Sequence, residues 1–277
     1  MSIGLTGLEG KIALVTGAGR MRSIGRPIAV ALAKAGCHVA LTGTGRPPER
    51  YPEDEQAADW RDIESVAEEI RALGRRALAV VSDVSKADAV EALLARVSAE
   101  LGGVDVLANN AGSSRGSDRV PIVDLGIEEW HRVIATNLHG TFYMSRACAQ
   151  RMVAQGRGGS IVNISSLYAR LLSAETGVYT ASKLAVNALS TVMAAELGPH
   201  GIRVNAVCPG MIDTSRHDDI RHGELWEGIV KTFVPLGRAG TGEDIANMVA
   251  FLCSDQGAWI TGQHIYIDGG HNFTPRR

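Results

Sequence analysis

The chain has 277 residues, 45% of them hydrophobic and 21% charged, a composition typical of a globular protein with a sizeable core. Its net charge of −2, without a run of basic residues, excludes the electrostatic footprint of a nucleic-acid-binding protein. No apolar run approaches the roughly 20 residues that span a bilayer, and the N-terminus lacks the pattern of a signal peptide. We therefore expect a cytoplasmic protein that binds neither nucleic acid nor a membrane.

The cysteines and histidines give no sign of a disulfide framework or a metal site. The eight histidines are dispersed, and the four cysteines are widely separated and form no Cys-x-x-Cys motif. We expect buried, reduced thiols at these four positions, which are Cys37, Cys148, Cys208 and Cys253.

Short strand-like runs alternate with helical patterns along the whole chain. The expected strands cover 11–17, 38–43, 76–84, 104–112, 159–166, 202–210 and 263–270. The expected helices cover 23–35, 63–74, 86–101, 127–155, 178–198 and 243–254. Parallel strands need crossover connections, which these helices supply. We predict an α/β fold in a single domain (1–277), with one doubly wound, Rossmann-type parallel sheet of about seven strands.

Two stretches fall outside this alternation. The polar, proline-rich stretch 45–62 is predicted to be a loop, and 211–240 is predicted to be a mobile lid over a substrate. The lid mixes polar and aromatic side chains, among them His217, Asp218, Asp219, His222, Trp226 and Phe233. Met211, Tyr168 and Leu172 are candidate pocket residues, with ordinary packing as the alternative.

A glycine-rich stretch, "TGAGRMRSIGRPIA" (16–29), follows the first expected strand and opens the first expected helix. In a doubly wound sheet, ligands bind beyond the carboxyl ends of the strands, where loop and helix N–H groups can meet a phosphate. Gly17 permits the turn, Gly19 allows close approach of the backbone, and Gly25 allows close helix packing. Ser23 is predicted to cap the helix. The alternative for the stretch is a purely structural turn.

The chain resembles the short-chain dehydrogenase/reductase family over nearly its whole length. The resemblance is carried by several motifs in order, which are "TGAG…SIG" (16–25), "SDV" (82–84), "NNAG" (109–112), Asn137 in "TNLHG", "NISS" (163–166), "YTASK" (179–183) and "VCPG" (207–210). The glycine loop departs from the family pattern, because two extra residues lie between Thr16 and Gly25 and Ser23 replaces the middle glycine. This spacing resembles the enoyl-reductase branch of the family.

The resemblance implies a nicotinamide dinucleotide cofactor, with the glycine loop on its phosphates. The expected contacts in that loop are Gly17, Gly19, Arg20, Ser23, Ile24 and Gly25. NAD-selective relatives place an acid at the end of the second strand, where this chain has Gly43. Thr44 and Arg46 follow, and they would suit the extra phosphate of NADP. We therefore predict NADP(H) over NAD(H), with a solvated loop at Arg46 as the alternative.

Further cofactor contacts are implied by the resemblance alone. Asp83 and Val84 would hold the adenine, with a strand-end cap as the alternative role of Asp83. Three residues of "NNAG" would line the adenosine ribose, namely Asn110, Ala111 and Gly112. Four residues at or just beyond the end of the sixth strand would lie beside the nicotinamide, namely Pro209, Gly210, Ile212 and Thr214.

Tyr179 and Lys183 are four residues apart in a helical pattern, so they share one helix face. A free tyrosine has a pKa near 10, and a nearby ammonium group favours the phenolate and lowers that pKa. By resemblance, Tyr179 exchanges the proton of an alcohol or ketone substrate, and Ser166 holds the substrate oxygen. Ser165 is the rival to Ser166, and the thirteen-residue spacing to Tyr179 favours Ser166.

Lys183 would also bind the nicotinamide ribose. Asn137 would hold a water that connects Lys183 to solvent, with a simple helix kink as the alternative. We predict NAD(P)-dependent interconversion of a secondary alcohol and a ketone. An enoyl reductase and a non-catalytic dinucleotide sensor are the rival functions.

The resemblance also implies a homotetramer, or a homodimer, formed partly through the helices at 127–155 and 178–198. Small residues on these helices suit close packing between subunits, namely Ala147, Ala149, Ala181, Ala185 and Ala188. An ordinary intramolecular helix face is the alternative.

Overall fold

One seven-stranded sheet organises the computed structural model, which describes residues 4–218 and 223–271. Its spatial order is β3-β2-β1-β4-β5-β6-β7, and all neighbouring strands are parallel. The strands are β1 (Ile12–Thr16), β2 (His38–Gly43), β3 (Ala77–Val81), β4 (Val106–Asn109), β5 (Gly159–Ile164), β6 (Ile202–Pro209) and β7 (His264–Ile267). The predicted α/β, doubly wound fold is confirmed.

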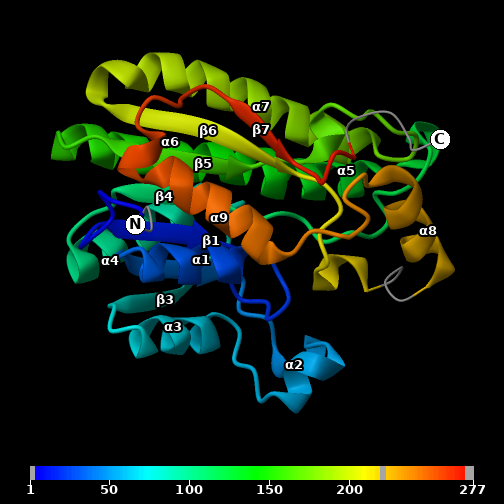
Figure 1. Cartoon of the computed structure of the whole chain (residues 1–277), viewed down its shortest axis with the longest axis horizontal. Helices are drawn as coiled ribbons and strands as arrows, with labels where there is room; N and C mark the ends of the chain where they lie inside the picture. Colours follow the sequence, from blue (N-terminus) through cyan, green and yellow to red (C-terminus); the bar gives the residue numbers. More distant parts are fainter. Residues whose placement is uncertain (1–3, 219–222, 272–277) are drawn as a thin grey trace.

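Helices cover both faces of this sheet (Figure 1). One layer is formed by α1 (Gly25–Lys34), α3 (Ile63–Ala72) and α9 (Gly242–Cys253). The other is formed by α4 (Ala87–Leu101), α6 (Gly140–Gln155) and α7 (Gly177–Leu197). Three further helices are α2 (Glu53–Ala57), α5 (Ile127–Ile134) and α8 (Glu224–Phe233). Within the described ranges, no helix has the length and apolar character needed to cross a membrane.

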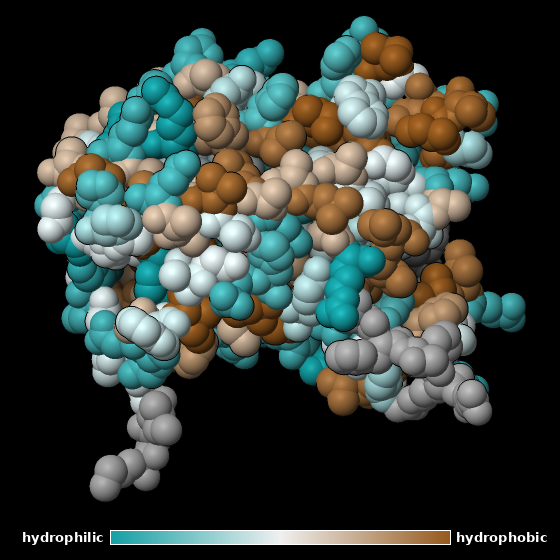
Figure 2. Space-filling view, turned by 90° about the horizontal axis from the view of Figure 1, so that it is seen from above, coloured by the Kyte–Doolittle hydropathy of each residue, from teal (hydrophilic) through white to brown (hydrophobic). Residues whose placement is uncertain are grey.

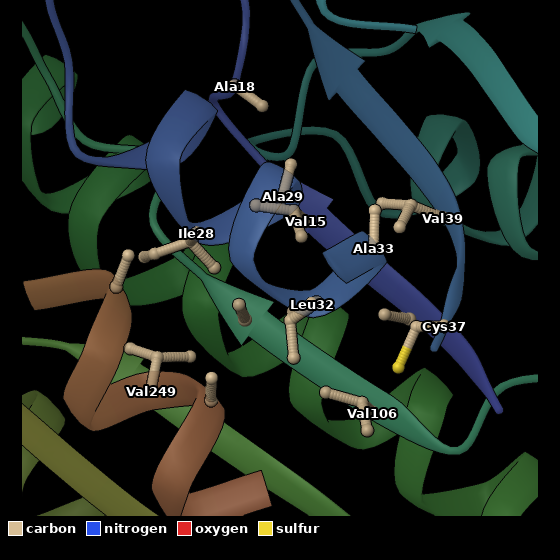
Figure 3. Packing of buried hydrophobic residues seen from close by; sticks show 14 of the residues in the cluster. Val15, Ala18, Ile28, Ala29, Leu32, Ala33, Cys37, Val39, Val106 and Val249 are labelled. Carbon is tan, nitrogen blue, oxygen red and sulfur yellow. The ribbon is translucent and has the colours of Figure 1, made fainter. Parts of the chain in front are cut away.

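Alternation along the strands divides the core into two clusters. In β1, Ala13 and Val15 face the α1–α3–α9 layer, whereas Ile12 and Leu14 face the α4–α6–α7 layer. Successive side chains of a strand point to opposite faces, so a strand covered on both sides must be apolar throughout. Figure 3 shows the first cluster, where α1 and α9 pack over β1 and β4.

The four predicted thiols are buried and unpaired, as expected. Burial raises the pKa of the Cys148 thiol to about 12, so this residue stays protonated at neutral pH. Cys37 lies in the first cluster beside α1 and β2 (Figure 3). These cysteines are therefore small packing residues rather than nucleophiles.

Three local predictions need correction. The expected helix 127–155 is continuous but contains a π-helical turn at Ala135–His139, between α5 and α6. The stretch 45–62 is not a plain loop, because it contains α2 and a 3-10 turn (Pro48–Arg50). The residue at the N-cap of α1 is Ile24, although the Ser23 Oγ accepts a hydrogen bond from the Arg26 N–H at 3.2 Å.

The lid segment is also more ordered than its sequence indicated. Its two ends are joined by a bridge between Ile212 and Gly240. The helix α8 contributes to a small cluster of its own, in which Trp226, Val230 and Val234 are buried. Asp219 and His222 lie outside the described residues.

The strand order reverses between β1 and β4, and this creates the crevice that a doubly wound sheet offers to ligands. The glycine loop after β1 and the "NNAG" segment after β4 meet there. The Asn110 side chain donates to the Gly17 and Thr16 carbonyl oxygens at 2.9 and 3.0 Å. The Thr16 Oγ1 accepts from the Asn110 and Ala111 N–H groups at 3.0 Å each.

Replacing Leu32 by alanine tests the first cluster. Leu32 is completely buried between α1, β1 and α9, so the variant should lose about 2–5 kcal/mol of unfolding free energy. Leu73→Ala is the matched control, because Leu73 is 40% exposed. Urea unfolding of both variants measures the difference, and equal losses would contradict this account of the core.

Candidate active site

The catalytic candidates gather beyond the carboxyl ends of the strands. Tyr179 and Lys183 lie in the first two turns of α7, and Ser166 follows β5 after one intervening residue. Asn137 lies in the π-helical turn between α5 and α6. The fold thus brings four residues from three separate segments to one region, as the sequence predicted.

Tyr179 is half-buried and Lys183 is buried. The Lys183 Nζ lies 5.8 Å from the centre of the Tyr179 ring and donates a hydrogen bond to the Ile164 carbonyl oxygen at 2.8 Å. Burial by itself would raise the pKa of Tyr179, but the positive charges of Arg216 and Lys183, with smaller effects of Ser166 and Arg119, lower it below its usual value. Tyr179 is therefore suited to gain and lose a proton.

The two candidate serines have different surroundings. Ser166 caps the 3-10 turn Leu167–Ala169, where its Oγ accepts from the Tyr168 N–H at 3.2 Å. Its hydroxyl also takes part in lowering the pKa of Tyr179, through a hydrogen bond. Ser165 instead donates to the Lys183 carbonyl oxygen at 3.1 Å. The geometry favours Ser166 as the serine beside Tyr179.

Asn137 is completely buried and joins two segments of the site. Its Oδ1 accepts from the Ser113 N–H at 2.8 Å, and its Nδ2 donates to the Ser182 Oγ at 3.0 Å. Its carbonyl oxygen accepts from the Thr141 hydroxyl at 2.8 Å. A π-helical turn often marks a functional site, and here it places the asparagine amide between the loop after β4 and α7.

Two arginines that the sequence motifs did not indicate also face Tyr179. The Arg119 Cζ lies 4.3 Å from the centre of the tyrosine ring, and the Arg216 Cζ lies 5.1 Å from it. Arg119 belongs to the loop after β4, and Arg216 to a 3-10 turn of the lid (Ser215–His217). Neither position lies in a family motif, so only the tertiary structure could reveal them.

The glycine loop presents the N-terminus of α1 to the crevice. The first turn of α1 has no acidic residue, and no side chain caps it at Ile24. A Cβ at Gly25 would lie 2.6 Å from the Gly17 carbonyl oxygen, so this close packing requires glycine. The Arg20 guanidinium makes only a long contact, of 3.5 Å, with the Ser215 hydroxyl.

The two residues inserted in this loop are held by the stretch 45–62. The Glu55 carboxylate accepts from the Met21 N–H at 2.8 Å. Arg22 forms ion pairs with Asp54 at 2.5 Å and with Asp218 at 2.8 Å. The Trp60 indole N–H donates to the Gly19 carbonyl oxygen at 2.6 Å. The loop insertion and the 45–62 excursion are therefore one structural unit.

Arg46, the residue predicted to favour NADP, is not free. Its guanidinium binds Glu55 at 2.8 Å and Asp62 at 3.4 Å. A Cβ added to Gly19 would lie 1.5 Å from the Asp62 Oδ1, so this carboxylate lies directly over the glycine loop. Asp62 also has a φ of +53°, which non-glycine residues rarely adopt. Thr44 is exposed nearby.

The remaining cofactor candidates occupy the crevice edge with clear structural roles. Asp83 accepts hydrogen bonds from the Ser85 N–H and hydroxyl at 2.9 and 2.8 Å. These bonds match the alternative role of Asp83, that of a strand-end cap. Val84 is buried, and Gly112 is exposed beside Asn137. After β6, which ends at Pro209, the Gly210 N–H donates to the Ile267 carbonyl oxygen at 3.0 Å. Ile212 and Thr214 are buried.

The pocket candidates differ in their placement. Tyr168 packs edge-on against Tyr179, with ring centres 6.2 Å apart. Met211 packs on the α8 cluster, and His217 lies 5.4 Å from the Trp226 ring. Leu172 is 67% exposed. Of these candidates, Tyr168 is the one whose ring packs against Tyr179.

The glycine loop at the N-terminus of α1, together with Lys183 and Tyr179, fits a nicotinamide dinucleotide. The N-terminus of α1 suits a pyrophosphate, because its N–H groups and dipole favour an anion. Buried Lys183 and half-buried Tyr179 suit a nicotinamide ribose beside a reacting carbon. No cluster of three or more potential metal ligands occurs in the ranges 4–218 and 223–271.

Comparisons with known proteins agree with this geometry. A 3-oxoacyl-(acyl-carrier-protein) reductase of Staphylococcus aureus is 40% identical over 260 residues, covering 94% of this chain and 97% of the relative. A 2-dehydro-3-deoxy-D-gluconate 5-dehydrogenase of Escherichia coli is 35% identical over 267 residues, covering 95% and 96%. A short-chain type dehydrogenase/reductase from Mycobacterium marinum has a similar structure, with a TM-score of 0.80, 35% identity and coverage of 96% and 97%.

A family model described as Enoyl-(Acyl carrier protein) reductase matches residues 17–272 of the chain. The matched region includes the glycine loop, "NNAG", Ser166, Tyr179 and Lys183, and the similar proteins extend over almost the same length. On these grounds the chain belongs to the short-chain dehydrogenase/reductase family.

Proposed function

We propose that the protein is an NAD(P)(H)-dependent oxidoreductase that interconverts a secondary alcohol and a ketone. One observation about Tyr179 carries this proposal. Its pKa is lowered by surrounding cations, and it lies next to Ser166 and Lys183. Such a phenol is an acid–base catalyst for a substrate hydroxyl.

In the proposed reaction, the alcohol loses a hydride from carbon and a proton from oxygen, which leaves a ketone. The bound cofactor supplies the site that accepts or returns the hydride. Tyr179 accepts the proton during oxidation and donates it during reduction. The Ser166 hydroxyl donates to the substrate oxygen and stabilises its developing negative charge.

Lys183 keeps the phenolate form of Tyr179 accessible and would hydrogen-bond the nicotinamide ribose. Asn137 is proposed to position α7 and the loop after β4, because its amide joins Ser182 to Ser113. Its predicted role in binding a water between Lys183 and solvent stays a prediction.

The description of the matching family model names enoyl reduction, which is the first rival function. By resemblance, the enoyl-reductase branch places its tyrosine and lysine further apart and lacks the serine of "NISS". Here Tyr179 and Lys183 are four residues apart and Ser166 is present. By their names, two relatives described above are a 3-oxoacyl-(acyl-carrier-protein) reductase and a 2-dehydro-3-deoxy-D-gluconate 5-dehydrogenase. Both observations support the carbonyl reaction. The second rival, a non-catalytic sensor, would have no need of a tuned phenol.

The choice between NADP(H) and NAD(H) depends on the surroundings of Arg46. The sequence favoured NADP(H), but Arg46 is bound by Glu55 and Asp62. The Asp62 carboxylate lies over Gly19, and its Oδ1 would be 3.9 Å from a Cβ at Gly43, the position of the missing acid. We propose that Asp62 replaces that acid, accepts the ribose hydroxyls and repels a 2′-phosphate, so that NAD(H) is preferred.

The oligomeric state stays a proposal, a homotetramer or a homodimer. Ala147 and Ala149 pack inside the chain's own core, so they do not form a subunit contact. On α7, in contrast, Leu184 and Val192 are 42% and 53% exposed. Figure 2 shows the molecule from above, on the side where α7 lies, and hydrophobic residues are interspersed with hydrophilic ones on this face. We further propose a cytoplasmic location and a single functional domain whose lid is 211–240.

Replacing Tyr179 by phenylalanine should lower kcat by about 10²–10⁴-fold, because the proton donor and acceptor is removed. Cofactor affinity, measured by nicotinamide fluorescence, should change little. Tyr143→Phe on α6 is the control, since Tyr143 packs in the second core cluster. Unchanged turnover in the Tyr179 variant would refute the proposed mechanism.

Activity should depend on pH in opposite ways for the two directions. Oxidation needs the phenolate of Tyr179, so its kcat rises as pH increases through the pKa, whereas reduction needs the phenol and declines. Because the pKa is lowered, the midpoint should lie below 10, the usual value for tyrosine. Rates at saturating cofactor measure both profiles, and a midpoint at or above 10 would contradict the assignment.

The variant Asp62→Asn tests cofactor choice. Asparagine tolerates the positive φ and removes the charge, so the preference for NADH over NADPH should fall by about tenfold or more. Asp59→Asn is a matched control, because Asp59 also has a positive φ but is exposed. Dissociation constants from fluorescence titration give the ratio. Tighter binding of NADPH by the unaltered protein would instead favour the Arg46 prediction.

A further inference from the structure

Two guanidinium groups converge on the catalytic tyrosine from different elements. Arg119 comes from the loop after β4, and Arg216 comes from the lid. Their Cζ atoms lie 4.3 and 5.1 Å from the centre of the Tyr179 ring. Arg216 is anchored by a hydrogen bond from its Nη1 to the Ser113 carbonyl oxygen. The lid and the loop after β4 thus meet at the place where a substrate must contact Tyr179.

Several polar atoms in this region are buried without a hydrogen-bond partner among the described residues. They are the Arg119 Nη1, the Arg216 Nη2 and the Ser113 Oγ. A buried donor without a partner is costly, and a cationic donor is more so. Such a set of donors indicates that a ligand completes the site.

The local charge also requires an anion. Arg119, Arg216 and Lys183 all lie around the Tyr179 ring. The Asp118 carboxylate pairs with one of them, with its Oδ2 3.6 Å from the Arg119 Nε. Arg216 has no ion pair within residues 4–218 and 223–271, so the excess charge is positive. Guanidinium groups bind carboxylates and phosphates through paired, charge-assisted hydrogen bonds.

We propose that Arg119 and Arg216 bind an oxyanion of the substrate, and that the substrate is therefore a hydroxy acid or its keto acid. This inference rests on the proposed function, because it places the carboxylate next to the carbon that Tyr179 serves. A phosphorylated alcohol or ketone presents the same chemistry and is separated from a carboxylate by the experiment. The phosphates of the cofactor are the competing occupant, since Ser215, next to Arg216, contacts Arg20 of the glycine loop.

The first experiment measures anion binding without turnover. Protein saturated with reduced cofactor is titrated with acetate and, separately, with inorganic phosphate, against chloride at equal ionic strength. Nicotinamide fluorescence and melting temperature are the readouts. We expect saturable binding that weakens about tenfold or more in Arg119→Gln and in Arg216→Gln, and less in the corresponding lysine variants, which keep the charge. Tighter binding of acetate supports a carboxylate, and tighter binding of phosphate a phosphorylated substrate.

Arg170→Gln is the matched control. Arg170 is exposed close to Tyr168 in sequence, but its guanidinium lies over Tyr266, 5.6 Å from the ring centre. This variant should bind anions like the unaltered protein. The proposal would be overturned if Arg170→Gln lost anion binding to the same degree as Arg119→Gln and Arg216→Gln. It would also be overturned if neither acetate nor phosphate bound saturably to the unaltered protein. If the melting temperature shows that cofactor-free protein binds these anions and that saturation with cofactor abolishes the binding, the arginines belong to the cofactor phosphates and the proposal is equally overturned.

The second experiment compares ketones with and without charge. Acetoacetate and levulinate are compared with their primary amides, and dihydroxyacetone phosphate with dihydroxyacetone. The charged member of a pair should have a kcat/KM about 10–100-fold higher, and this ratio should fall towards one in Arg216→Gln. Equal turnover of charged and neutral ketones would refute the anion site while leaving the oxidoreductase function intact. Anion binding without turnover of any ketone would refute the proposed function and leave the anion site standing.

Discussion

The site depends on a phenol that is half-buried and yet is easier to ionise than usual. Burial opposes the phenolate of Tyr179, so cations must outweigh that penalty. Lys183 is one helical turn away, but Arg216 and Arg119 come from the lid and from the loop after β4. The lowered pKa of Tyr179 therefore depends on the assembled fold rather than on the Tyr-x-x-x-Lys motif alone.

The two ends of the crevice differ in their electrostatics. At the glycine loop, Arg22 and Arg46 each meet two carboxylates, so their charge is largely neutralised. At the tyrosine, two guanidinium groups keep buried nitrogen atoms without partners within the described ranges. A bound dinucleotide and an anionic substrate would thus meet different arrangements of charge.

The departures of this chain from the family pattern compensate for one another. The glycine loop is longer by two residues, and the connection after β2 is extended by the 45–62 excursion. The excursion supplies Glu55, which binds Met21, and Asp54, which binds Arg22. It also places Asp62 over Gly19, near the strand end where Gly43 lacks a carboxylate.

The sequence by itself determined the sheet, its helical layers and the segments that carry Ser166, Tyr179, Lys183 and Asn137. Apolar periodicity and motif spacing are local features of the sequence, and they can be recognised without knowing which residues are in contact in the fold. Only the tertiary structure decided that Arg46 is neutralised by Glu55 and Asp62, and that Arg119 and Arg216 face the tyrosine. Arg119 and Arg216 lie 60 and 37 residues from Tyr179 in the sequence. A side chain's charge partner depends on which loops the sheet brings together. The local sequence pattern carries no information about which loops are brought together.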